Sequence, residues 1–149
     1  MKKTIIYYIL CLAIALVGGS CSDDEDTPVD TALLTGTWQW VGEYDSDEVG
    51  DGYDGWDYEL DKSWPSCMVI HEDHYGYRLY TPTDRNEYNR FTWSCSDNRV
   101  SLHYDDEEAT DAQIWIIEKL TNEELLWRID CYEEGYYWVE KELYRRYHP

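Results

Sequence analysis

Alternation of apolar and polar residues is the feature of this 149-residue chain that most limits its fold. Trp38 and Trp40 share one parity with Tyr44, and polar residues lie between them. Such a period of two places successive side chains on opposite faces of a strand. The same pattern recurs along the chain between turn residues. It predicts strands over 36–44, 67–72, 75–80, 88–95, 99–104, 113–120, 125–131 and 136–146.

The order of these strands predicts how their apolar faces are buried. Short links join all of them except the first two, which are separated by the long connection 45–63. Strands in meander order lose both free edges when the last pairs with the first. We therefore expect an all-β fold, an eight-stranded antiparallel up-and-down β-barrel in which 36–44 pairs with 136–146.

One segment also fits a helix. Residues 121–124 match a capping box, and Leu125 and Ile129 follow at helical spacing. The flanking runs 114–117 and 136–139 are rich in β-branched and aromatic residues, which favour strands. We expect a strand over 125–131.

The first strand carries a short motif, Gly36-Thr37-Trp38. Followed by eight up-and-down strands, this motif resembles the lipocalin superfamily, in particular the small lipocalin-like domains of anchored bacterial lipoproteins. The resemblance spans roughly residues 34–147. It implies that Trp38 lies at the closed end of the barrel under an arginine of the last strand, either Arg145 or Arg146. The C-terminal helix and the later motifs of lipocalins are not recognisable here.

In-phase aromatic residues suggest what the barrel does. A barrel of this size holds its own side chains or one small ligand. We expect a non-catalytic protein that binds a small apolar or amphipathic molecule, and a filled core is the alternative. The residues expected to line the ligand site are Trp40, Tyr77, Trp93, Tyr104 and Trp127.

Two other functions remain open. Aromatic side chains such as Trp56, Tyr58 and Trp64 would let an accessory lipoprotein stack on glycans. The third possibility is a structural or host-interaction module without a small ligand. We find no motif of a catalytic nucleophile, phosphate loop or zinc protease, so we expect no enzyme and no cofactor.

The N-terminus has the composition of an export signal. Lys2 and Lys3 precede an apolar run, 5–17, which is too short for a bilayer span. The small residues 18–20 before Cys21 resemble a bacterial lipobox, although Gly18 stands where leucine is usual. The resemblance implies acylation of Cys21, for example with palmitate; an ordinary secretory signal is the alternative. The expected organisation is signal peptide 1–20, lipidated cysteine and acidic tether 21–33, and lipocalin-like barrel 34–149.

An acidic run follows the cysteine directly. It resembles the signal that sends lipoproteins of certain Gram-negative anaerobes to the outer face of the outer membrane, and a solvated spacer is the plainer interpretation. We therefore expect a lipid-anchored, surface-exposed monomer of the outer membrane. The run consists of Ser22, Asp23, Asp24, Glu25 and Asp26.

The charge of the chain limits its partners. It has 12 basic and 32 acidic side chains, a formal net charge of −20. Loss of residues 1–20 removes two lysines, which leaves 10 − 32 = −22. Such a protein is repelled by nucleic acid and by anionic head groups. Its partner is the membrane, and acyl chains, not electrostatic attraction, must hold the protein there.

Some residues of the chain have side chains that bind metals or form disulfides. The loop 45–57 is rich in carboxylates and glycines, but Val49 stands where an EF-hand loop needs an oxygen ligand. We expect a solvated loop over the barrel mouth, and an irregular calcium loop is the alternative. His71 and His74 have opposite parity on a strand and lack a third ligand at zinc spacing. We expect no metal. Three cysteines remain, Cys67, Cys95 and Cys131. An oxidising compartment permits one disulfide among them, and burial as free thiols is the alternative.

Overall fold

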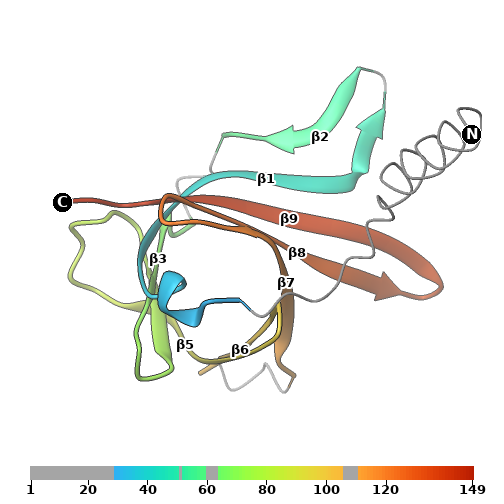
Figure 1. The fold of residues 1–149 in the computed structure, drawn as a ribbon. Helices are drawn as coiled ribbons and strands as arrows, with labels where there is room; N and C mark the ends of the chain where they lie inside the picture. The colour runs from blue at the N-terminus through green and yellow to red at the C-terminus, as the bar shows by residue number, and fades with distance from the viewer. Residues whose placement is uncertain (1–28, 51, 60–63, 106–110) are drawn as a thin grey trace, which may run out of the picture.

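The computed structural model describes residues 29–50, 52–59, 64–105 and 111–149 (Figure 1). Within these ranges the chain forms one short 3-10 helix and nine strands. All predicted strands are confirmed, including 125–131, which is strand and not helix. The elements are η1 (Thr31–Leu33), β1 (Gly36–Gly50), β2 (Tyr53–Asp57), β3 (Cys67–Ile70), β4 (Tyr75–Leu79), β5 (Tyr88–Ser96), β6 (Arg99–Tyr104), β7 (Gln113–Leu120), β8 (Glu124–Glu133) and β9 (Tyr136–Arg146).

The sheet closes on itself, as predicted. Its strand order is β2-β1-β3-β4-β5-β6-β7-β8-β9, and β1 also pairs with β9. Trp38 lies opposite Arg146 at one end of this seam, and Asp45 lies opposite Glu140 at the other. Eight antiparallel strands, β1 and β3 to β9, therefore form a barrel without a free edge.

Strand β1 is longer than the sequence predicted because it has three partners. Residues 36–39 pair with β3, 38–45 with β9 and 43–50 with β2. The outer half of β1 and all of β2 form a hairpin that projects from the barrel (Figure 1). We expected an irregular loop here. Gly52 before β2 and Gly55 at the register shift inside β2 both have positive φ, a conformation that glycine adopts without strain.

A bulge in β1 decides which side chains face inward. The register with β9 shifts between Trp40 and Gly42, so Trp40 lies opposite Tyr144 but Glu43 lies opposite Glu142. A bulge adds one residue to one strand and so reverses the parity beyond it. Tyr44, which the sequence placed in phase with Trp38, therefore shares its face with Lys141 instead.

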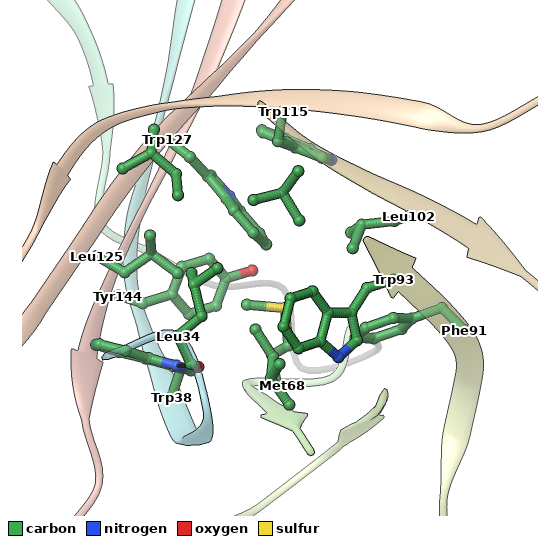
Figure 2. Close-up of a cluster of buried hydrophobic side chains, with 13 residues drawn as sticks. Leu34, Trp38, Met68, Phe91, Trp93, Leu102, Trp115, Leu125, Trp127 and Tyr144 are labelled. Atoms are coloured by element: carbon green, nitrogen blue, oxygen red, sulfur yellow. Dashed lines mark hydrogen bonds between the residues drawn. The ribbon is translucent and has the colours of Figure 1, made fainter. Parts of the chain in front are cut away.

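The interior of the barrel is packed with aromatic rings. Trp38, Phe91, Trp127 and Tyr144 are fully buried, and Figure 2 shows these rings converging from different strands on the interior. Burying a large apolar side chain contributes about 1.5–3 kcal/mol. This part of the barrel is therefore filled core.

The closed end is covered by an arginine. The Arg146 guanidinium lies 4.1 Å from the ring centre of Trp38 and donates to the carbonyl oxygens of Leu33 and Thr35. The Trp38 indole N–H donates to the Leu34 carbonyl at 2.7 Å. Of the two candidate arginines, Arg146 is the one over Trp38, whereas Arg145 is exposed.

The N-terminal predictions lie mostly outside the described residues. This holds for the signal peptide 1–20, for Cys21 and for the acidic run 22–26. The last part of the expected tether is visible, and Val29 packs on the core and donates its N–H to the Asp97 carbonyl at 3.2 Å. In the described part of the chain, no helix has the length and apolar character needed to cross a membrane.

Candidate functional site

The end of the barrel opposite Trp38 is hollow. A cavity of about 1110 Å³ is lined by residues of β1, β2, β4 to β7 and β9. Ligand pockets in proteins commonly enclose about 300–1,000 Å³. We call this space the mouth cavity. Its lining residues are Glu43, Tyr44, Asp45, Glu48, Gly55, Asp57, Glu59, Trp64, Arg78, Glu87, Asn89, Arg90, Tyr104, Asp105, Gln113, Trp115, Glu140, Lys141 and Glu142.

A buried charge network separates the mouth cavity from the filled core. Arg78 donates to the hydroxyl of Tyr144 at 2.9 Å and lies 3.6 Å from Glu142 Oε2. The same carboxylate oxygen accepts from the Trp127 indole at 3.0 Å and from the Tyr144 hydroxyl at 2.9 Å. A second Arg78 nitrogen lies 3.5 Å from the Tyr104 hydroxyl. Arg78 is thus held by polar partners on the floor of the cavity.

The ionisation of this network follows from its surroundings. Burial alone would lower the pKa of Arg78, but the oxygens of Tyr144, Glu142 and Tyr104 outweigh it and raise this pKa well above its ordinary value. Burial raises the pKa of Tyr144 in turn, although the Arg78 charge opposes the shift. The guanidinium therefore stays charged and the phenol stays neutral at physiological pH.

Carboxylates dominate the walls above this floor. Burial raises the pKa of Glu43, and the charges of Glu142, Asp57 and Glu140 raise it further. Among the described residues, the lining has positive charge from Arg78, Arg90 and Lys141 alone. The mouth cavity is therefore strongly acidic, with apolar surface from Trp64, Tyr104 and Trp115.

The predicted ligand residues are only partly at the cavity. Tyr104 lines it. Trp93 and Trp127 belong to the buried core, and Trp40 is half-buried against that core. Tyr77 lies outside the cavity lining and packs against Cys67, Val69 and Leu79 in a separate cluster.

The outward orientation of Tyr77 has a steric cause. Gly76 lies opposite Phe91, and a Cβ at Gly76 would overlap the Phe91 ring. Gly76 and the next residue of the same parity, Arg78, therefore face inward, and Tyr77 faces outward. The apolar alternation of β4 suggested the opposite assignment.

Most lining residues were missed by the sequence analysis. Because the chain has 32 acidic side chains, a carboxylate by itself does not mark a site in the sequence. Their spacing did contain a usable pattern, since Glu140 and Glu142 have the parity of the buried Tyr144. An acidic residue in phase with the core of a barrel strand indicates a cavity.

A second group of aromatic rings lies near the mouth, of which Trp56 is half-buried and Tyr58 and Trp64 are exposed. Trp56 and Tyr58 have ring centres 6.0 Å apart and planes within 10° of parallel. Tyr58 and Trp64 are 62% and 61% exposed, which is unusual for such large side chains. Trp64 also lines the mouth cavity.

The histidines and cysteines considered as metal or disulfide sites lie in separate places in the barrel. Among the described residues, no three His, Cys, Asp or Glu side chains converge to hold a metal ion; Asp51 of the candidate calcium loop lies outside them. His74 packs on Trp93, with ring centres 4.9 Å apart, and His71 on Tyr77. Cys67, Cys95 and Cys131 are free thiols. Burial, followed by the charge of Glu140, raises the pKa of Cys131 to about 11.

A closed up-and-down barrel, sealed at one end and hollow at the other, defines the lipocalin-like class. The family model of the lipocalin-like domain matches residues 34–127, which is more than half of the chain. The chain therefore belongs to this family, and the expected lipocalin-like fold is confirmed. No curated protein shows a significant match to the chain.

Proposed function

We propose that this protein binds one small amphipathic molecule in the mouth cavity and does no chemistry on it. The observation that carries the proposal is the cavity of about 1110 Å³ above the floor formed by Arg78 and Tyr104. Polar groups fix the orientation of a ligand in such pockets, and apolar walls supply contact area. A ligand with both kinds of surface fits this lining better than a purely apolar one.

The test uses a neutral fluorescent probe, N-phenyl-1-naphthylamine. We expect saturable one-site binding to the full chain. Gln113→Trp places a large ring at the wall of the cavity and should weaken probe binding about tenfold or more. Gln39→Trp makes the same change at an exposed position of β1 outside the cavity lining and should leave binding unaltered. Absence of saturable binding, or equal effects of the two substitutions, would sink the proposal.

Glycan binding is the second candidate, and the near-parallel rings of Trp56 and Tyr58 favour it. Aromatic rings of this kind stack on the faces of sugars. Native gels containing neutral polysaccharides test it. We expect retardation of the protein that Tyr58→Ala abolishes and Tyr80→Ala, at another exposed ring, does not. Unretarded migration in every polysaccharide rules this candidate out.

We also propose that acyl chains on Cys21 anchor the barrel to the outer membrane, with the acidic run 22–26 directing it to the cell surface. The sequence of residues 1–26 supports this part of the proposal. Labelling with radioactive palmitate in a Gram-negative host should mark the protein and not the Cys21→Ser variant. Protease treatment of intact cells should remove the barrel, and protection from the protease would contradict surface exposure.

A further inference from the structure

Carboxylates lie directly opposite one another on the wall of the mouth cavity. Glu43 of β1 pairs with Asp57 of β2 on one side and with Glu142 of β9 on the other. At the next position on the same face of β1, Asp45 pairs with Glu140 of β9. Opposite residues of antiparallel strands point to the same face, with Cβ atoms about 5 Å apart. We call Glu43, Asp45, Asp57, Glu140 and Glu142 the carboxylate wall.

Such an arrangement of like charges is electrostatically unfavourable by itself. Like charges placed directly opposite destabilise a sheet. Of the carboxylate wall, only Glu142 forms an ion pair with another described residue, Arg78. Lys141 is adjacent in sequence, but its ammonium group pairs with Glu118 at 2.9 Å. The described cations therefore leave most of the wall uncompensated.

The wall does not have the geometry of a metal site. No group of three ligating side chains converges within the described residues. A hard cation needs several oxygens at about 2.0–2.6 Å from one point. Carboxylates spread over three strands suit a larger cation, whose charge is shared by several N–H donors.

The remaining lining residues supply the apolar side of such a site. Trp115 and Tyr104 lie on the neighbouring strands β7 and β6, and both line the cavity. Aromatic faces attract cations and also cover hydrocarbon. The cavity thus combines negative charge on β1, β2 and β9 with aromatic surface across from it.

We infer that the ligand of the mouth cavity is an organic cation, an ammonium or guanidinium compound with an aromatic or aliphatic body. Its charged group lies against the carboxylate wall, chiefly Glu43, and its body lies against Tyr104 and Trp115. This inference rests on the proposed function, because it specifies the ligand of the same cavity.

The experiment compares three probes that share a naphthyl body and differ in the charge of the polar group: 2-(1-naphthyl)ethylamine, 2-(1-naphthyl)ethanol and 1-naphthaleneacetic acid. Calorimetric titration of the full chain at low salt should rank them amine, alcohol, acid, with the amine about tenfold tighter than the alcohol. High salt should narrow this gap because it screens the charges.

Substitutions separate the wall from the general negative charge of the protein. Glu43→Gln should weaken amine binding about fivefold and leave alcohol binding unchanged. Glu123→Gln removes the same charge at the far end of the barrel, near His148, and should change neither. Glu43 makes no hydrogen bond in the floor network, so its substitution leaves Arg78 in place.

The outcomes distinguish the two proposals. Equal binding of amine and alcohol, or tighter binding of the acid, overturns the cationic ligand while binding in the cavity stands. The cationic ligand is also overturned if Glu123→Gln weakens amine binding as much as Glu43→Gln does. Failure of the three probes together with N-phenyl-1-naphthylamine overturns the binding function itself. Displacement of the amine by millimolar Ca²⁺ alone would assign the wall to a metal and also contradict the inference.

Discussion

The two ends of this barrel are built by the same two strands and have opposite character. At the closed end, β1 and β9 bring together Trp38 and Arg146, whose polar groups are satisfied by backbone oxygens. At the mouth, the same strands bring Asp45 opposite Glu140. One end is arranged for stability, and the other holds repelling charges around a cavity.

The difference shows how one strand pair can place residues that stabilise the fold at one end and residues that line a cavity at the other. The bulge after Trp40 reverses the parity of β1, so that Glu43 and Asp45 share the face of Glu142 and Glu140. Aromatic packing ends there and the acidic cavity begins. Substitutions at the closed end should therefore change stability, and those at the mouth should change ligand binding and pH dependence.

The largest expected effect tests the closed end. Trp38→Ala removes a fully buried indole and should lower the free energy of unfolding by about 4 kcal/mol. Trp64→Ala at the mouth removes an equally large ring that is 61% exposed and should change it by less than about 0.5 kcal/mol. Urea denaturation measures both. Equal losses would mean that the two ends do not differ in the way described.

A second substitution tests the floor between the two ends. Glu142→Gln leaves the Arg78 guanidinium without its carboxylate and should cost about 3 kcal/mol. Combining it with Arg78→Met should restore most of the loss, since a buried pair can be replaced by apolar groups. Urea midpoints of the single and double variants test this. A double variant less stable than Glu142→Gln alone would show that Arg78 stabilises the barrel by other contacts.

Much of the fold could be predicted from the sequence because strand periodicity is a local property. The strands ending at Leu120 and Tyr104 have the predicted bounds, and the pairing of β1 with β9 follows from meander order. Hairpin β1–β2 was missed, since its alternation is interrupted by glycines and aspartates that are also typical of loops.

The candidate site was harder to predict because it depends on which side chains of β1 and β4 face inward, and local irregularities decide this in both strands. One extra residue after Trp40 moved Glu43 to the inside, and the ring of Phe91 over Gly76 moved Tyr77 to the outside. A single-residue change of register exchanges the two faces of a strand. Neither event has a local pattern in the sequence. Of the proposed ligand residues only Tyr77 is displaced by parity. Trp40, Trp93 and Trp127 face inward but pack in or against the filled core, so among the five Tyr104 alone lines the cavity.

The third prediction compares the two arginines at the closed end. Arg146→Gln removes the cation over Trp38 and the bonds to Leu33 and Thr35, and should cost about 2 kcal/mol. Arg145→Gln alters an exposed side chain and should cost less than about 0.5 kcal/mol. Thermal unfolding by circular dichroism measures both. A larger effect at Arg145 would contradict the role given to Arg146.

The smallest expected effect is a gain in stability at the mouth. Burial and the neighbouring carboxylates raise the pKa of Glu43 in the folded protein above its ordinary value of 4.5. The folded state therefore binds this proton more tightly than the unfolded state does. The contribution of Glu43 to stability is most favourable below the ordinary pKa and declines as pH rises through the raised pKa.

Glutamine stays neutral at every pH, so Glu43→Gln should be more stable than the native protein by about 0.5 kcal/mol near neutral pH. The gain should vanish at about pH 3.5, where Glu43 itself is protonated. Urea denaturation at the two pH values measures it, with Glu123→Gln as the control for loss of one charge at a remote, exposed position. A gain that persists in acid, or that Glu123→Gln reproduces, would show that repulsion along the carboxylate wall is not what distinguishes the mouth from the closed end.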